Sequence, residues 1–190
     1  QFGMLEEMYP GRIDLGLGRA PGTDQQTLGR ALRRDPMSAE RFPQDVIELQ
    51  AWLSNQSPIE GVTAVPGFGT DVPLYILGSS MFGASLAAKL GLPYSFASHF
   101  APQHLEQACA YYRANYEPSE RYPEPYLIAA VNVTAADTAE DADRQEEIVH
   151  RNRVRSLIGR RGQLLSDDQL DAVVQSYQGK QIIDMLRYTA

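Results

Sequence analysis

Short apolar segments alternate with segments of helical spacing along the chain. Four segments have the pattern of strands, residues 13–17, 74–77, 94–98 and 126–133. In the first of them, apolar residues alternate with polar residues or glycine, which is typical of a strand. The second is a continuous apolar run, and this pattern predicts a strand covered on both faces. A short strand is also compatible with residues 62–65, inside a turn-rich stretch.

Helical segments separate these strands, and several of their ends carry recognisable signals. Residues 81–90 are rich in alanine and are followed by Gly91, which can take the left-handed conformation that ends many helices. Thr138 with Asp141 resembles a capping box that opens a long charged helix. The other expected helices are the last turns of one at residues 2–8, one from Thr23 or Asp24 to about Arg34, one that begins at Pro43 and buries Val46, Leu49, Trp52 and Leu53, one at 102–116, and one from Asp167.

This alternation of strands and helices is the order of parallel βα units, which predicts the α/β class. An open doubly wound sheet fits it, and so does half of a (β/α)8 barrel, whose full form takes about 250 residues. Periodicity alone does not choose between them. The chain begins inside a helix at Gln1 and ends at Ala190 without a polar tail. We therefore expect residues 1–190 to form a single, incomplete domain of about four βα units.

Composition narrows the range of partners. The 190 residues include 24 acidic and 17 basic ones, so the formal net charge is −7. This balance lacks the basic surface that nucleic acids and anionic membranes require, and we expect neither partner. No apolar run approaches the roughly 20 residues that cross a bilayer. The single Cys109 excludes an internal disulfide framework and suits a reducing cytosol, which predicts a cytoplasmic protein.

The first candidate site is a turn that follows the second strand. In either architecture, ligands bind at the carboxyl ends of the strands. There, an apolar strand ends at Gly78, two hydroxyls follow at Ser79 and Ser80, and a helix begins. The N–H groups at a helix start bind anions and the hydroxyls add donors, so the turn is a candidate phosphate site. The alternative is structural, because serine is a common N-cap and glycine suits a tight turn.

Two other residues follow strands. Arg19 stands just beyond the first strand, where a guanidinium can bind a phosphate with two hydrogen bonds, although a solvated surface arginine is the commoner case. Gly16 and Gly18 do not form a dinucleotide-binding fingerprint, because the third glycine is missing. His99 is a candidate for contact with a substrate, or equally for a structural hydrogen bond. We expect no metal site, since no group of His, Asp and Glu has metal-ligand spacing.

Three motifs occur in the order in which a known enzyme family has them. They are residues 9–19, from Tyr9 to Arg19; residues 72–80 with Gly83 and with Gly91-Leu92-Pro93; and Val131-Asn132-Val133 with residues 136–138. They resemble, respectively, the fourth strand, the fifth strand with its phosphate turn and helix, and the seventh strand of luciferase-like flavin-dependent monooxygenases. Each motif is moderately specific, and their combination covers nearly the whole chain.

The resemblance implies a (β/α)8 TIM barrel that binds FMN, or in one branch a deazaflavin. It implies that Arg19 and the Ser79-Ser80 turn approach the same flavin phosphate, with Gly78, Met81 and Gly83 along the phosphate and the ribityl chain. The implied activity is oxygenation of a small organic substrate with reduced flavin and O2. NAD(P)H or a flavin reductase would supply the electrons. The family usually forms homodimers.

This sequence also departs from the family. If the motifs are aligned correctly, the first three strands and the eighth strand are absent from this chain. The family often places a reactive histidine in the absent amino-terminal part, so we assign no catalytic residue. Two alternatives to a monooxygenase remain open. One is a flavin-binding protein without turnover, and the other is a different phosphate-binding α/β enzyme, such as a sugar-phosphate isomerase.

Overall fold

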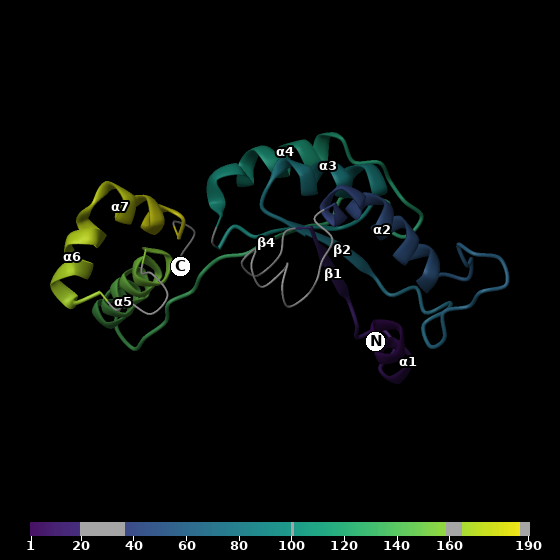
Figure 1. Cartoon of the computed structure of the whole chain (residues 1–190), viewed down its shortest axis with the longest axis horizontal. Coiled ribbons are helices and arrows are strands. Elements are labelled where there is room, and N and C mark those ends of the chain that lie inside the picture. Colours follow the sequence, from purple (N-terminus) through teal and green to yellow (C-terminus); the bar gives the residue numbers. More distant parts are fainter. Residues whose placement is uncertain (20–36, 100, 159–164, 187–190) are drawn as a thin grey trace. The chain divides into compact units, whose positions relative to one another are not determined.

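The computed structural model describes residues 1–19, 37–99, 101–158 and 165–186 (Figure 1). The helix expected between Thr23 or Asp24 and Arg34 lies outside the described residues. The elements, in chain order, are α1 (Phe2–Met8), β1 (Leu15–Gly18), α2 (Ser38–Leu53), β2 (Leu74–Gly78), α3 (Met81–Leu90), β3 (Tyr94–Phe96), the 3-10 helix η2 (Pro102–His104), α4 (Leu105–Ala114), β4 (Leu127–Ala129), α5 (Ala139–Ile158), α6 (Asp167–Gln175) and α7 (Tyr177–Asp184).

The four strands form one sheet in the order β1-β2-β3-β4. β1 pairs in parallel with β2, with Leu15 opposite Leu74, and β2 pairs in parallel with β3, with Ile76 opposite Tyr94. Strands that follow each other in the chain are therefore neighbours in the sheet. A doubly wound sheet reverses its strand order at a switch point, whereas a βα barrel does not. The sheet order agrees with part of a barrel.

The two faces of the sheet differ in burial. Leu74 and Ile76 are 3% and 0% exposed, whereas Leu77, on the opposite face of β2, is 42% exposed. The expectation that this strand is covered on both faces is therefore wrong for this chain. Gly16 of β1 lies beside Leu77, and a Cβ at Gly16 would come within 2.8 Å of the leucine Cδ1. On the exposed face of the sheet, the Leu77 side chain therefore lies over Gly16, in space that a larger residue at position 16 would need.

The described chain divides into two compact units. The first comprises residues 1–96 and 106–128, and the second comprises residues 97–105 and 129–190. Each unit is described by itself below, and the expectation of a single domain stays a prediction.

Buried tyrosines form the centre of the first unit. Tyr94 and Tyr112 are both fully buried, and their ring centroids lie 5.6 Å apart. The Tyr112 hydroxyl donates to the carbonyl of Leu92 at 2.9 Å and accepts from the Tyr126 N–H at 3.1 Å. These bonds tie α4 to the amino ends of β3 and β4.

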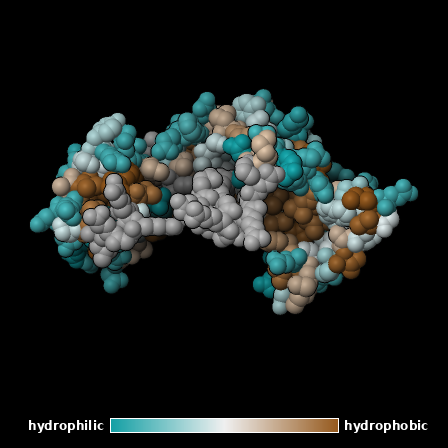
Figure 2. All heavy atoms as spheres, in the orientation of Figure 1, coloured by the Kyte–Doolittle hydropathy of each residue, from teal (hydrophilic) through white to brown (hydrophobic). Residues whose placement is uncertain are grey.

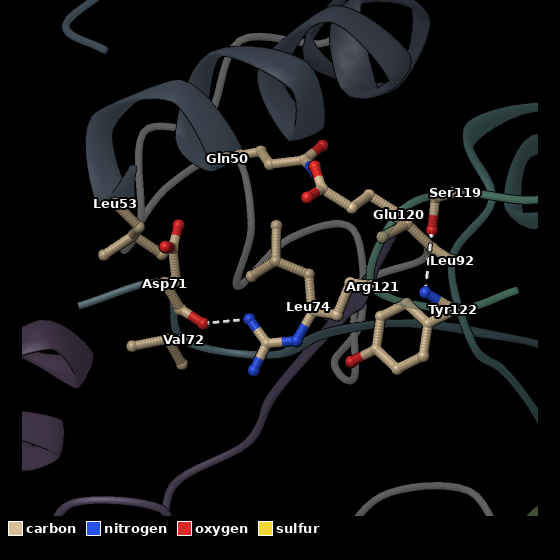
Figure 3. Close-up of a pocket in the computed structure, with 10 residues that line it drawn as sticks. All are labelled: Gln50, Leu53, Asp71, Val72, Leu74, Leu92, Ser119, Glu120, Arg121 and Tyr122. Atoms are coloured by element: carbon tan, nitrogen blue, oxygen red, sulfur yellow. Dashed lines mark hydrogen bonds between the residues drawn. The ribbon is translucent and has the colours of Figure 1, made fainter. Parts of the chain in front are cut away.

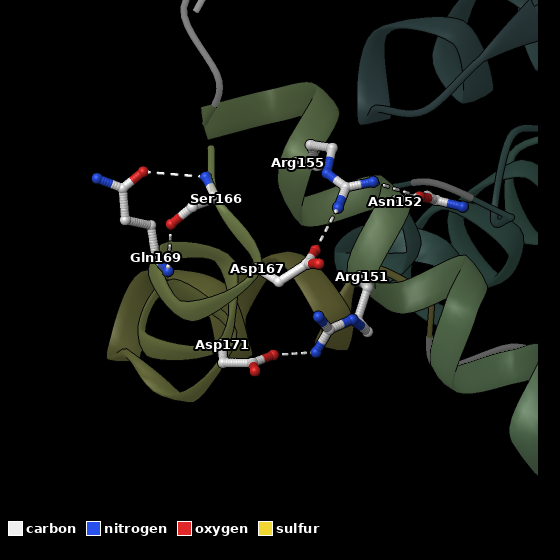
Figure 4. A network of polar contacts seen from close by, with 7 residues as sticks. All are labelled: Arg151, Asn152, Arg155, Ser166, Asp167, Gln169 and Asp171. Carbon is white, nitrogen blue, oxygen red and sulfur yellow. Dashed lines mark hydrogen bonds and ion pairs between the residues drawn. The ribbon is translucent and has the colours of Figure 1, made fainter. Parts of the chain in front are cut away.

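Three helices pack together in the second unit. Val154 of α5, Leu170 of α6 and Ile182 of α7 form its hydrophobic core. Ion pairs join Arg151 to Asp171 and Arg155 to Asp167, the latter at 3.3 Å (Figure 4). Both expected helix starts are confirmed, as α6 begins at Asp167 and the Thr138 hydroxyl accepts the Asp141 N–H at 3.1 Å before α5.

Three expected elements differ from the structure. Pro43 lies inside α2, which begins at Ser38, because the buried Phe42 and Val46 on either side hold the helix together despite one missing backbone hydrogen bond. Residues 62–65 form no strand. β4 spans only Leu127–Ala129 instead of eight residues.

The segment between α2 and β2 exposes several hydrophobic side chains, visible as brown atoms on the right of Figure 2. They are Ile59, Val62, Val65 and Phe68, which are 37% to 80% exposed. In the part of the chain that the structure describes, no helix is long and apolar enough to span a membrane.

Candidate functional site

The turn between β2 and α3 presents the start of a helix at the carboxyl end of a strand. β2 ends at Gly78, and α3 begins at Met81 after the N-cap residue Ser80, whose backbone is extended (φ −148°, ψ 168°). The Ser80 side chain makes no capping hydrogen bond. The first N–H groups of an α-helix have no partner within the helix. The turn therefore keeps backbone donors that a serine cap would have used.

Tyr94 supports this turn from the neighbouring strand. Its hydroxyl donates to the Ser80 carbonyl at 3.0 Å. Burial raises the pKa of Tyr94, so the hydroxyl keeps its proton and remains a donor at neutral pH. Sequence reasoning missed this role. The available signal was a tyrosine in an apolar strand, because a buried hydroxyl needs a hydrogen-bond partner.

The two glycines of the turn have a packing role. A Cβ at Gly83 would lie 3.0 Å from Cε2 of Tyr94, and a Cβ at Gly78 would lie 3.6 Å from the Cα of Gly83. Glycine at both positions lets α3 start close to β2 and to the tyrosine ring. Contact of these glycines with a ligand stays a prediction.

Arg19 reaches the same helix start from β1. Gly18, the residue before it, is paired with Leu77 of β2. The Arg19 guanidinium carbon lies 3.9 Å from the ring centroid of Phe82, the second residue of α3. Such stacking is a favourable cation–π contact, and it holds the guanidinium beside the helix start. The structure thus places the Arg19 guanidinium against Phe82, two residues after Ser80, and this contact with Phe82 was not foreseen.

These groups suit a dianion. A guanidinium offers parallel N–H donors to phosphate oxygens, and helix-start N–H groups favour negative charge. The Ser79 and Ser80 side chains are half-buried, and Arg19 is exposed, so a ligand can reach all three. The residues present therefore fit a phosphate group, including that of a flavin nucleotide.

His99 belongs to the second unit, where it is half-buried. Its carbonyl accepts the Asn132 side-chain N–H at 2.7 Å. His99 and Asn132 line a cavity of about 490 Å³ together with residues of α5, among them Arg153. Sequence reasoning did not select Arg153, because its position on a charged helix gave no sign of a cavity. The described residues contain no group of His, Cys, Asp and Glu that could hold a metal ion.

Another cavity, of about 610 Å³, lies at the amino end of β2 (Figure 3). Val72, Leu74 and Leu92 contribute apolar surface, and the Arg121 guanidinium donates to the Asp71 carbonyl across it. The serine turn follows the opposite end of the same strand. In βα barrels the amino-terminal face serves stability and the carboxyl-terminal face binds ligands, so we do not choose this cavity as the site.

Comparisons with known proteins agree with one family. A family model described as luciferase-like monooxygenase matches residues 1–180. A relative from Escherichia coli (strain K12), named luciferase-like monooxygenase, is 50% identical over 143 residues, which are 75% of this chain and 43% of the relative. The N-acetyl-S-alkylcysteine monooxygenase of Bacillus subtilis (strain 168) is 29% identical over 184 residues, 93% of this chain and 54% of that protein.

A solved structure is similar over the same extent. The crystal structure of apo-MsnO8 matches with a TM-score of 0.74 and 31% sequence identity, and the match covers 91% of this chain and 50% of that chain. The chain thus spans about half the length of the curated relatives and of the solved structure that it matches.

Proposed function

Because the chain belongs to the luciferase-like monooxygenase family, we propose that it provides the phosphate-binding part of an FMN site in an oxidoreductase. The observation that carries the proposal is the Arg19 guanidinium stacked on Phe82, beside the serine turn at the start of α3. The resemblance implies that Arg19 and the serine turn approach one phosphate, and the contact of Arg19 with Phe82 supports this.

Each residue of the proposed site has a defined part. Arg19 neutralises charge on the phosphate and orients it with parallel N–H groups. The Ser79 and Ser80 hydroxyls and the first N–H groups of α3, from Met81 onward, donate to the remaining oxygens. Gly78 and Gly83 keep the turn compact. When bound, reduced flavin supplies the electrons with which an enzyme of this kind uses O2 to oxygenate a small organic substrate.

The proposal extends to partners that belong to the whole protein. We propose a homodimer in the cytoplasm that receives electrons from a flavin reductase or NAD(P)H. The Bacillus subtilis relative is named for a substrate that contains a thioether and a carboxylate, so small organic sulfur compounds are the first substrates to try. A deazaflavin is the alternative cofactor.

The test compares FMN with riboflavin, which lacks the phosphate. Arg19→Gln removes the guanidinium but keeps a polar side chain of similar length. Hydrogen bonds to a charged group contribute about 1.5–3 kcal/mol, so FMN affinity should fall roughly 10-fold to 100-fold. Riboflavin affinity should not change. Fluorescence titration of both flavins measures the two dissociation constants.

Arg12→Gln is the matched control. Arg12 precedes β1, and its guanidinium lies near the Tyr9 ring, 5.9 Å from the centroid, away from the β2–α3 turn. The control should bind FMN as the unchanged chain does. Equal affinity of the unchanged chain for FMN and riboflavin would refute the phosphate site, and so would equal losses in the two arginine variants. Tighter binding of a sugar phosphate than of FMN would favour the isomerase alternative.

A further inference from the structure

A cavity in the second unit is not used by the proposed flavin site. It has a volume of about 490 Å³, and its lining includes His99, Asn132, Val149, Asn152, Arg153 and Leu186. This volume is within the range of pockets that hold small organic ligands. The lining combines polar groups with aliphatic side chains. Such a mixture is suited to a small molecule with one polar end.

Arg153 differs from its neighbours on α5. Its Nε is buried and has no hydrogen-bond partner among the described residues. By contrast, Arg151 and Arg155 point toward carboxylates of α6 and pair with them (Figure 4). Arg144, near the start of the helix, pairs with Asp141. A buried guanidinium N–H without an acceptor is unfavourable, and Arg151 and Arg155 do not carry this cost.

The lining defines the charge of a ligand that would fit the cavity. Among the described residues that line the cavity, none is acidic and Arg153 is the one permanent cation. A single guanidinium balances one negative charge, and its planar fork matches the two oxygens of a carboxylate. Val149 and Leu186 offer apolar surface to a short aliphatic chain. We propose that this cavity binds a small aliphatic carboxylate, with Arg153 as the residue that holds the carboxylate group.

The proposal does not depend on flavin binding. All lining residues belong to the second unit, whereas Arg19 and the serine turn belong to the first. A chain that binds no FMN could still bind a carboxylate here, and the reverse also holds. Titrations with the two kinds of ligand therefore test the two proposals separately.

The experiment uses hexanoate as the probe and hexanol as its neutral counterpart. Isothermal titration of the full chain should give saturable binding of hexanoate, and hexanol should bind at least 10-fold more weakly. Arg153→Gln should weaken hexanoate binding at least 10-fold and leave hexanol unchanged. Arg153→Lys, which keeps the charge but not the planar fork, should recover part of the affinity.

Arg144→Gln is the matched control, since it removes the same charge from the same helix at an exposed position. It should bind hexanoate as the unchanged chain does, and circular dichroism should confirm that all variants are folded. Absence of hexanoate binding at 50 mM would overturn the proposal. Equal binding of hexanoate and hexanol would also overturn it, as would equal losses in the Arg144 and Arg153 variants. Inorganic phosphate that displaces hexanoate at a lower concentration would overturn the assignment to a carboxylate.

Discussion

At the scale of single residues, buried tyrosine hydroxyls hold the first unit together. Tyr112 accepts and donates backbone hydrogen bonds at the amino ends of two strands, and Tyr94 supports the turn at the carboxyl end of β2. Both side chains are fully buried. A hydroxyl in such a position must stay protonated, because an ionised oxygen would lose its solvation. The free energy of unfolding should therefore fall as the pH rises into the alkaline range.

Burial raises the pKa of Tyr112 to about 12 and also raises that of Tyr94. Above about pH 10 the unfolded chain releases these protons while the folded chain keeps them. The free energy of unfolding is then unaffected by these groups below about pH 10 and falls between pH 10 and 12, by at most about 1.4 kcal/mol per pH unit for each tyrosine. Urea denaturation at pH 8, 10 and 11 measures this slope.

Tyr112→Phe should reduce that alkaline slope. Tyr177→Phe is the control, because Tyr177 is 79% exposed and its substitution should leave the slope unchanged. A stability that stays constant from pH 8 to 11 would contradict the argument. A slope that is equally steep in the Tyr112 variant would assign the effect to other groups.

The residues that sequence reasoning found and missed differ in one physical respect. Arg19, Ser79 and Ser80 lie at strand and helix ends, which the hydrophobic pattern marks directly. Phe82 and Arg153 owe their roles to neighbours from other elements, 63 and 54 positions from Arg19 and His99, respectively. A pattern along the chain carries local information, so it could not show these contacts.

At the scale of elements, the amino end of β3 takes part in two separate hydrogen bonds. Its first residue, Tyr94, donates to Ser80 beside the proposed phosphate site. The Tyr112 hydroxyl donates to Leu92, which precedes the strand on the side of its amino end. The two hydroxyls are thus equally buried, but only that of Tyr94 bonds to a residue of the proposed site.

Substitution of these two tyrosines separates stability from binding. Tyr94→Phe removes the bond to Ser80 and should lower the free energy of unfolding by about 1 kcal/mol. It should also weaken FMN binding several-fold, because the turn is no longer held in place. Tyr112→Phe should lower stability by at least as much and leave FMN affinity unchanged. Fluorescence titration and urea denaturation measure the two effects, and equal losses of FMN affinity in the two variants would contradict a specific role of Tyr94.

The ends of helices and strands were not predicted equally well from the hydrophobic pattern. The limits of α3 were predicted at residues 81 and 90, since Gly91 can take the left-handed conformation that ends a helix, and the structure confirms this conformation (φ 60°). β4 was expected to continue to residue 133. In the structure the Ser98 hydroxyl accepts the Ala130 N–H at 3.0 Å and donates to the Ala130 carbonyl. A side chain thus replaces the backbone ladder there, and an apolar sequence cannot reveal such a replacement.

At the scale of the whole molecule, the family and the α/β class could be predicted from sequence, whereas the two compact units could not. The strand and helix order specifies parallel βα units, and the sheet order β1-β2-β3-β4 agrees with it. The division into units depends on which side chains meet across distant segments, such as Val154, Leu170 and Ile182. Sequence alone predicts one domain, which would unfold in a single transition. The separate core of the second unit predicts that the two units unfold in separate transitions.

The chain offers a direct probe for this difference, since its single tryptophan, Trp52, lies in the first unit. Leu170 is fully buried in the core of the second unit, so Leu170→Ala should destabilise that unit by about 2–5 kcal/mol. If the units unfold separately, part of the helical signal in circular dichroism will disappear at lower urea concentration in the variant. The midpoint of the Trp52 fluorescence transition should then stay where it is in the unchanged chain.

Leu53→Ala is the reciprocal variant, because Leu53 is buried in the first unit near the end of α2. It should move the Trp52 fluorescence transition to lower urea concentration. The part of the helical signal that Leu170→Ala shifts should stay where it is in the unchanged chain. If either substitution moves both signals together, the 190 residues unfold as one cooperative domain and the separate-unit prediction is wrong. Separate transitions would mean that the carboxylate cavity and the proposed phosphate site can each form without the other, since their lining residues fold in different units.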